Sequence, residues 1–332
     1  MTTVAFFNNK GGVGKTSLVY HLAWMYADLG LSVLAADLDP QANLTAMFLD
    51  EDRLEQLWPV DGDHRQSIIG AFQPILSGTG DLASPHVEPI SERLGLVVGD
   101  LALSRLEGML AQAWPNSMDR QEPAFRQLSA FHRLLVDAAN QRSADIVLMD
   151  VGPNLGAINR AAMIASEHVA IPLAPDLYSL QGLRNLGPAL REWRREWGER
   201  LTKRPSAALV LPEGKMAPIG YIIMQHAVRA GRPARAYERW TARVPAEYRS
   251  SVLGIRDPSK VPAWTVDGYC LSLIKHYRSL MPMAMEAHKP MFFLKPADGA
   301  IGAHTAAVAA CYEDFKQLAI RIAENCGVAL PA

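Results

Sequence analysis

Short runs of apolar residues recur along this chain, and stretches with apolar residues at helical spacing separate most of them. Several runs are continuous rather than alternating, which is typical of strands that helices cover on both faces. The predicted strands are residues 3–7, 32–37, 94–98, 145–150, 168–173 and 219–224, with a short last strand at 291–294. Strands that alternate with helices predict an α/β fold, a doubly wound, mainly parallel sheet with helices on both faces.

A glycine-rich loop follows the first predicted strand and leads into a predicted helix at residues 17–29. Leu18, Leu22 and Met25 lie near helical spacing in that segment, and Gly30 is a natural C-terminal stop. A strand, a glycine loop and a helix N-terminus in this order form a site where backbone N–H groups and the helix dipole bind phosphate.

The loop reads K-G-G-V-G-K-T-S, which is a P-loop with an extra lysine at its start. Glycines let the backbone fold tightly around phosphate oxygens. In a P-loop the later lysine, here Lys15, neutralises the β- and γ-phosphates, and the hydroxyl of Thr16 holds Mg²⁺. The predicted nucleotide-binding residues of the loop are Lys10, Gly11, Gly12, Val13, Gly14, Lys15, Thr16 and Ser17.

Acidic residues stand at the ends of two other predicted strands. Asp37 and Asp39 belong to the segment D-L-D-P-Q-A-N-L-T, and Asp150 ends the strand at 145–150. Ligands of α/β sheets bind at the carboxyl ends of strands, so these carboxylates can polarise a water or hold Mg²⁺ beside the P-loop. An apolar strand that ends in Asp is also the Walker B pattern. Asp39 is equally compatible with a helix N-cap that has Pro40 at the first helical position.

Composition limits the class of protein. The chain has 332 residues, of which 49% are hydrophobic and 20% charged, as expected for a globular protein. We expect one domain, residues 1–332, with elaborations at about 50–93 and 190–265 that are rich in turn signals. No apolar run reaches membrane-spanning length, and the N-terminus leads straight into a strand, which favours a cytoplasmic protein. The three cysteines are scattered without a C-x-x-C pair, so disulfide, zinc and iron–sulfur sites are disfavoured.

The net charge of −1 hides an uneven distribution. Residues 184–278 hold 18 Lys or Arg against 8 Asp or Glu, whereas the rest of the chain holds 15 against 26. A basic segment of this kind is a candidate surface for nucleic acid.

Together these motifs resemble the ParA/MinD family of deviant Walker A ATPases, and within it the Soj-like ParA partition ATPases. K-G-G-V-G-K-T-S resembles the P-loop of that family, with Lys10 as the signature lysine. The segments D-L-D-P-Q-A-N-L-T and D-I-V-L-M-D-V-G-P-N-L-G resemble its second motif and its Walker B region. The similarity is strong in the first 45 residues and around Asp150, and weaker segments at 94–107, 171–183 and 285–290 extend it over most of the chain.

The resemblance implies a slow, partner-stimulated, Mg²⁺-dependent ATPase that forms a homodimer when ATP binds. Lys10 would reach the phosphates of the partner subunit, Lys15 would hold those of its own subunit, and Asp39 would orient the attacking water. Thr16, Asp39 and Asp150 would serve Mg²⁺. Gln225, after the strand at 219–224, would join the nucleotide-binding residues, with Met224 where the family usually has Thr.

The resemblance also implies partners for the ATP-bound dimer, namely DNA without sequence preference and a ParB-like or other activating protein. The candidate DNA-binding residues recur at three- or four-residue spacing, which would line one face of a helix. They are Arg229, Arg232, Arg235, Arg239 and Arg243. The alternatives are a solvated or protein-binding basic face, and the Gly-Arg-Pro at 231–233 argues against one continuous helix.

Two other functions remain open at this stage. The enlarged regions are compatible with a ParA-like regulatory or assembly ATPase that acts on a protein complex. A MinD-like, membrane-positioned regulator would need a basic amphipathic C-terminal helix. Residues 311–332 instead carry Glu313, Asp314 and Glu324, so we expect no membrane partner.

Overall fold

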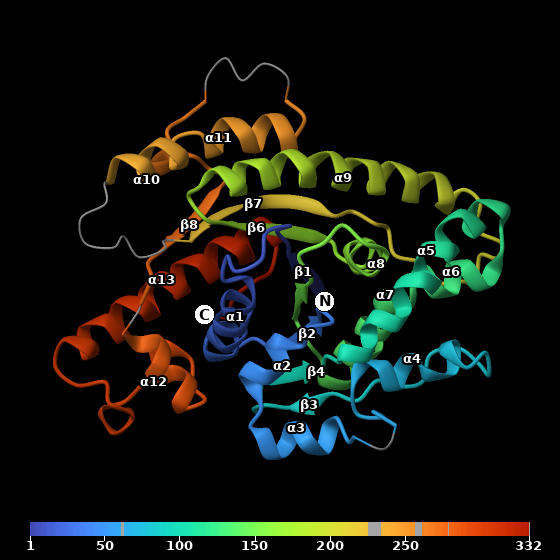
Figure 1. Cartoon of the computed structure of the whole chain (residues 1–332), viewed down its shortest axis with the longest axis horizontal. Coiled ribbons are helices and arrows are strands. Elements are labelled where there is room, and N and C mark those ends of the chain that lie inside the picture. Colours follow the sequence, from blue (N-terminus) through green and yellow to red (C-terminus); the bar gives the residue numbers. More distant parts are fainter. Residues whose placement is uncertain (61–62, 225–233, 256–260, 278, 332) are drawn as a thin grey trace.

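The computed structural model describes residues 1–60, 63–224, 234–255, 261–277 and 279–331, without the side chains of 234–237. Within these residues one eight-stranded sheet has the order β3-β4-β2-β5-β1-β6-β7-β8, and every neighbouring pair except β3–β4 is parallel (Figure 1). The strands are β1 (Thr2–Phe6), β2 (Val33–Leu38), β3 (Glu88–Pro89), β4 (Leu94–Val97), β5 (Ile146–Val151), β6 (His168–Leu173), β7 (Ala217–Met224) and β8 (Cys270–Ile274). The predicted doubly wound, mainly parallel α/β fold is therefore confirmed.

Helices cover both faces of the sheet, because side chains along each strand point alternately to the two sides. In β1, Val4 and Phe6 belong to one apolar core and Ala5 to the other. The first core lies under α1 (Lys15–Asp28), α2 (Asn43–Phe48), α3 (Glu51–Leu57), α12 (Leu280–Glu286) and α13 (Ala303–Cys326). The second lies under α4 (Ile68–Leu76), α5 (Leu106–Asn116), α6 (Glu122–Leu128), α7 (Ala130–Arg142), α8 (Ala157–Ile164), α9 (Leu177–Leu201) and α11 (Val244–Glu247). Helix α10 (Ala234–Thr241) precedes α11.

One predicted strand is wrong, and two strands, β3 and β8, were not predicted. Residues 291–294 do not form a strand: Met291–Phe293 is a short 3-10 helix, and Phe292 packs against α1 and α13 through His21 and Phe315. The last strand is β8, which sequence analysis missed. Strand β8 is an edge strand with one neighbour, and Ser272 and Leu273 are only half-buried, so its sequence lacks the continuous apolar run of a central strand.

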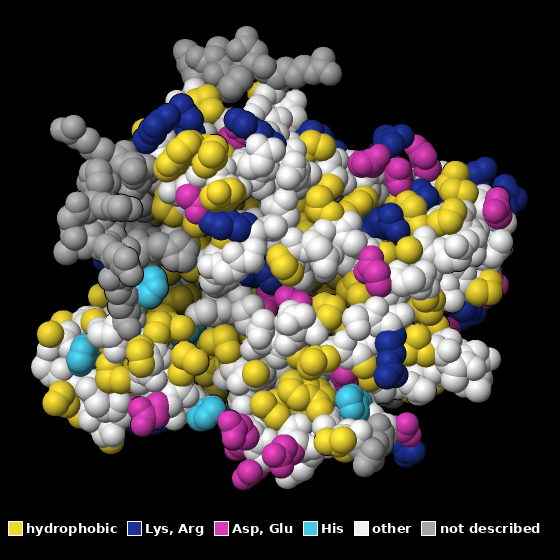
Figure 2. All heavy atoms as spheres, viewed as in Figure 1, with side chains coloured by type: hydrophobic (Ala, Val, Ile, Leu, Met, Phe, Trp, Pro, Cys, Tyr) yellow, Lys and Arg dark blue, Asp and Glu magenta, His cyan; other side chains and the backbone are white. Residues whose placement is uncertain are grey.

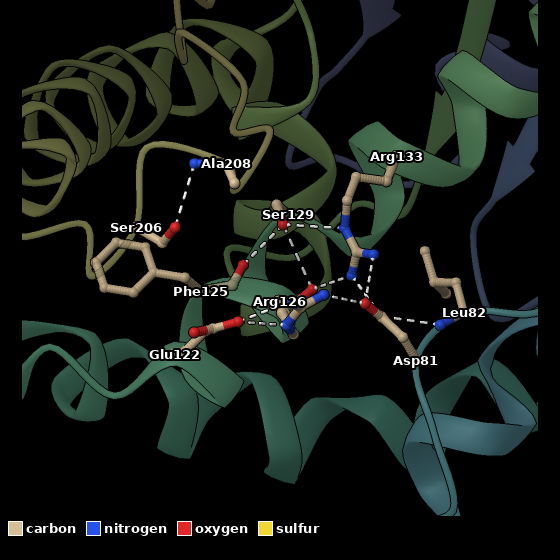
Figure 3. Close-up of polar contacts among 9 residues, drawn as sticks. All are labelled: Asp81, Leu82, Glu122, Phe125, Arg126, Ser129, Arg133, Ser206 and Ala208. Atoms are coloured by element: carbon tan, nitrogen blue, oxygen red, sulfur yellow. Dashed lines mark hydrogen bonds and ion pairs between the residues drawn. The ribbon is translucent and has the colours of Figure 1, made fainter.

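The elaboration at 50–93 contains α3, α4 and the two-residue strand β3, and charged side chains fix its end to the helices beside it. The Asp81 carboxylate accepts hydrogen bonds from Arg133 (2.8 and 2.9 Å) and from Arg126 (2.6 Å), and Arg126 also pairs with Glu122 (Figure 3). These contacts join the segment after α4 to α6 and α7, so α4 and this segment lie on the same face of the sheet as those helices, whereas α3 lies on the other face.

The second elaboration, 190–265, is less irregular than its turn signals indicate, because it includes the second half of α9 and all of β7. Helices α10 and α11 follow β7, and Figure 1 shows α11 beside α9, with α10 beyond the N-terminal end of α9. Figure 2 shows Lys and Arg side chains along this α9–α11 side, whereas acidic side chains gather over α3 at the opposite end. Among the described helices, none is both long and apolar enough to cross a membrane.

A buried histidine links α1 to the segment around Met291. The Nδ1–H group of His21 donates to the carbonyl of Ser17 (2.6 Å), and Nε2 accepts from the N–H of Met291 (3.1 Å). Both ring nitrogens are satisfied only when the ring is neutral. Burial lowers the pKa of His21 from 6.5 to about 4, although the hydrogen bond to Ser17 opposes this shift.

We expect this histidine to make the folded state sensitive to mild acid. Because the folded-state pKa is below the unfolded one, stability is fully present above pH 6.5 and is lost as the pH falls toward 4. The free energy of unfolding should decrease by about 2 kcal/mol from this group between pH 7 and pH 5, measured by denaturant titration. His21→Phe, which keeps a ring beside Phe292 and Phe315, is expected to be less stable at pH 7 but to lose this part of the pH dependence. Equal pH dependence in the two proteins would contradict the assignment.

Candidate nucleotide-binding site

The P-loop joins β1 to α1 at the carboxyl edge of the sheet. Gly12 (φ +74°) and Gly14 (φ +87°) take the left-handed conformation that favours glycine, and a Cβ atom at Gly11 or Gly12 would meet only open space. Helix α1 begins at Lys15, and no side chain caps its N-terminus. The first N–H groups of α1 and the open side of the loop therefore form a cradle of the kind that binds phosphate.

Lys15 and Asp150 form a buried ion pair at the base of this cradle. Nζ of Lys15 lies 2.6 Å from Oδ1 of Asp150, and their side chains are 7% and 0% exposed. Burial raises the pKa of Asp150, although the ammonium of Lys15 and the hydroxyl of Thr16 oppose the shift. Among the described residues, Oδ2 of Asp150 is buried without a hydrogen-bond partner. An unsatisfied carboxylate oxygen beside a lysine and a threonine hydroxyl fits a site for Mg²⁺ and phosphate.

The two aspartates at the end of β2, one inside the strand and one just after it, have different hydrogen-bond partners. Asp37 is fully buried, and its Oδ2 accepts from both the N–H and the hydroxyl of Thr45 (2.8 Å each). Burial and the neighbouring carboxylate of Asp150 raise the pKa of Asp37 to about 7, although the hydrogen bonds from Thr45 oppose this shift. Asp37 thus holds α2 to the end of β2, and its Oδ2 is already used by Thr45.

Asp39 is 7% exposed, and its Oδ1 accepts from the N–H of Gln41 (3.0 Å). It is not a helix N-cap: α2 begins at Asn43, and Ala42 before it has a left-handed backbone (φ +51°). The alternative reading with Pro40 at the first helical position is therefore wrong. The turn after Asp39 instead displaces the helix by several residues and leaves Asp39 in the loop that faces β5.

Lys10, the extra lysine of the P-loop, is held within its own subunit. Its ammonium pairs with Asp176 and lies 5.7 Å from the ring centre of Tyr178. Asp176 also caps α9 by accepting from the N–H of Ser179 (2.9 Å). Sequence analysis missed Asp176, although Asp is one of the residues favoured at the N-cap position just before a helix. Lys10 remains 30% exposed at the rim of the site.

Asn8 is a second residue that sequence analysis did not single out. It is 1% exposed, its Nδ2 donates to the carbonyl of Pro172 (2.6 Å), and its Oδ1 accepts from the N–H of Lys10 (2.9 Å). These two bonds fix the start of the P-loop to the end of β6.

A mainly apolar pocket of about 230 Å³ opens beside the P-loop. Gly12, Gly14 and Ser17 line one side, and Met224 and Tyr277 contribute to the other. Gln225, the predicted nucleotide-binding residue that follows Met224, lies outside the described residues. The pocket brings the end of β7 and the segment after β8 next to the phosphate cradle.

The candidate DNA-binding arginines do not share one described helix. Arg229 and Arg232 lie outside the described residues, and the side chain of Arg235, in α10, is also outside them. Arg239 is in α10, whereas Arg243 follows its end, and both guanidinium groups stack near the ring of Trp240 (5.1 and 5.2 Å). Both arginines are exposed, so the described part of the pattern is a short arginine–tryptophan cluster.

Comparison with known proteins extends these observations. A family profile described as an AAA domain matches residues 1–203, which include the P-loop, Asp39 and Asp150. The protein IncC of Escherichia coli is 25% identical over 272 residues (80% of this chain, 64% of IncC), and the chromosome-partitioning ATPase Soj of Thermus thermophilus is 29% identical over 210 residues (60% of this chain, 65% of Soj). The chain belongs to the ParA/MinD family. It is a family of ATPases that includes Soj-like partition ATPases. The matches span less than two thirds of the length of IncC and of Soj.

Solved structures confirm the fold of this ParA/MinD member over nearly its whole length. The protein DIP2308 of Corynebacterium diphtheriae superposes with a TM-score of 0.73 at 22% identity and covers 98% of each chain. The septum site-determining protein MinD of Pyrococcus horikoshii, complexed with Mg-ADP, has a TM-score of 0.52 at 14% identity and covers 98% of each chain. At these identities the likeness concerns the fold alone.

Proposed function

We propose that this chain is an ATP-dependent dimeric switch that hydrolyses ATP to ADP and phosphate and, as the ATP dimer, binds DNA without sequence preference to partition DNA or position a cargo. The observation that carries the proposal is the buried Lys15–Asp150 ion pair below the P-loop. Among the described residues, Oδ2 of Asp150 has no hydrogen-bond partner, and no side chain caps the N-terminus of α1 after the loop. A family of ATPases supplies the reaction class.

Each residue of the site has a role in this proposal. When bound, Mg-ATP supplies the phosphoanhydride that a water cleaves into ADP and phosphate. Lys15 exchanges part of its contact with Asp150 for the phosphates, while Asp150 and the hydroxyl of Thr16 hold the metal shell. Asp39 orients the attacking water toward the γ-phosphorus. The mainly apolar pocket at Met224 and Tyr277 receives the base.

The surface around the site supports closure against a second copy of the chain. Leu101, Leu155, Leu177 and Tyr178 are 39–72% exposed, and each follows the carboxyl end of β4, β5 or β6. Exposed apolar side chains on the edge that carries the phosphates are typical of an interface. Closure would separate Lys10 from Asp176 and bring its ammonium to the phosphates of the partner subunit.

Sedimentation with ATP and with ADP, together with retention on DNA under the same conditions, tests the switch. We expect a dimer that is retained on DNA with ATP, and a monomer that is not retained with ADP. A monomer under both conditions would refute the nucleotide switch. A dimer that forms with ATP but is not retained on DNA would support the nucleotide switch and would favour a role on a protein complex.

The DNA surface is tested by reversing two charges of α10, one of which, Arg239, belongs to the arginine–tryptophan cluster. Arg235→Glu with Arg239→Glu should weaken retention of the ATP dimer on DNA, and the slope of log affinity against log salt should fall by about one for each phosphate that the variant no longer neutralises. Arg65→Glu is the matched control, because Arg65 is 84% exposed and lies outside the basic segment. Unchanged retention of the double variant on DNA would show that DNA binds to another surface of the protein.

A further inference from the structure

A buried asparagine holds the loop between β5 and α8 in place. Asn159, in the first turn of α8, is 1% exposed. Its Oδ1 accepts from the N–H of Gly152 (3.1 Å), and its Nδ2 donates to the carbonyls of Gly152 (2.8 Å) and Asn154 (2.6 Å). Three hydrogen bonds from one side chain thus hold the backbone just after Asp150, and Nδ2 also contacts Oδ1 of Asn154 (3.2 Å).

Gly152 lies between Asn159 and Asp39. A Cβ atom at Gly152 would lie 3.3 Å from Nδ2 of Asn159 and 3.5 Å from Oδ1 of Asp39. The Asn159 amide and the Asp39 carboxylate therefore bound the same space on the Cβ side of Gly152, and only a residue without a side chain leaves that space open. Asp39 has little other support, since among the described residues its side chain accepts a hydrogen bond only from Gln41.

A second side chain supports α8 without reaching Asp39. Glu107, from α5, accepts from the N–H groups of Ala157 (2.6 Å) and Ile158 (3.0 Å), the first two residues of α8. A carboxylate at this position stabilises the helix through its unpaired N–H groups and its dipole. Glu107 therefore offers a matched comparison, because it stabilises the same helix and makes no contact with Gly152.

We infer that Asn159 is a positioning residue for Asp39: by fixing the backbone of Gly152 it sets the limit of the space that the Asp39 carboxylate can occupy. This inference rests on the proposed function, in which Asp39 orients the attacking water. A small displacement of a group that orients a water reduces the rate of the chemical step more than it reduces the affinity for the substrate.

The test uses this chain with Asn159→Leu, which keeps the branched shape of the side chain and removes its hydrogen bonds. We expect kcat for ATP hydrolysis to fall about 10- to 100-fold, with ATP affinity changed less than about 2-fold. Asn159→Asp, which keeps the acceptor for the N–H of Gly152, should retain more activity than Asn159→Leu. Glu107→Gln should lower the melting temperature but leave kcat within about 2-fold. Equal loss of kcat in Glu107→Gln would mean that general loosening of α8 is the cause and would overturn the inference.

Two further readouts separate this inference from the proposed function. In an Asp39→Ala background, Asn159→Leu should cost no additional kcat, because residues that act as a unit are not additive. Residue-resolved amide exchange of the nucleotide-free protein should show faster exchange at Gly152 and at Gln41, whose N–H reports the place of Asp39, in Asn159→Leu but not in Glu107→Gln. If Asn159→Leu exchanges the amide of Gln41 at the wild-type rate, the inference is overturned, even if the wild type hydrolyses ATP. If that exchange is faster in Asn159→Leu, the inference is supported, even if the wild type does not hydrolyse ATP.

Discussion

Sedimentation of the Lys15→Ala variant is expected to show the same monomeric species with ATP as with ADP. Lys15 contributes the buried ammonium at the base of the phosphate cradle, 2.6 Å from Asp150. Without it, the negative charge of the phosphates would face the carboxylate of Asp150 with no intervening cation. ATP binding, dimer formation and DNA retention should therefore be lost together, which makes this the largest effect of any single substitution in the site.

A folding control is needed, because Lys15→Ala removes one partner of a buried ion pair. Such a removal destabilises a protein by about 3–5 kcal/mol when the other charge stays buried. The double variant Lys15→Ala with Asp150→Asn leaves no uncompensated charge and should recover most of the lost stability, yet it should still fail to dimerise with ATP. A double variant that is well folded and dimerises with ATP would refute the role of Lys15 in the switch.

Asp39→Ala is expected to have the second largest effect. Whereas Lys15→Ala should abolish retention on DNA, Asp39→Ala should prolong it. Removal of the carboxylate that orients the water should lower kcat for ATP hydrolysis by about 100-fold or more. ATP binding should persist, since Lys15, Asp150 and the loop glycines are untouched. The ATP dimer should then accumulate and remain on DNA after a chase with ADP, measured as the rate of release.

Asp39→Asn serves as the matched variant for this prediction. It keeps the hydrogen bond from the N–H of Gln41 and the shape of the side chain, so a similar loss of turnover would show that the charge itself is required. ATP turnover at the wild-type rate in Asp39→Ala would remove Asp39 from the mechanism. In that case the carboxylate that acts on the water would have to be sought elsewhere.

The sequence determined most of the sheet and the core of the site. Central strands that are buried on both faces need continuous apolar runs, so β2, β5 and β6 were predicted nearly residue for residue. The P-loop was equally readable, because the bend at Gly12 and Gly14 excludes most other residues. Local sequence also located Asp39 and Asp150, since parallel strands bring their carboxyl ends to one edge.

The tertiary structure decided which groups contact each other across long separations in the chain. Asp176 is 166 residues from Lys10, and their pairing follows from β6 lying beside β1. Asp37 and Asp39 look interchangeable in sequence, but the folding of α2 back over β2 directs Thr45 to Asp37 and not to Asp39. The edge strand β8 escaped prediction because an edge position relaxes the apolar pattern. The apolar pattern of a buried strand and the glycines of a tight loop depend on neighbouring residues, so the sequence alone shows them. Which side chains pair across the site depends on the order of the strands in the sheet, so only the tertiary structure shows those pairs.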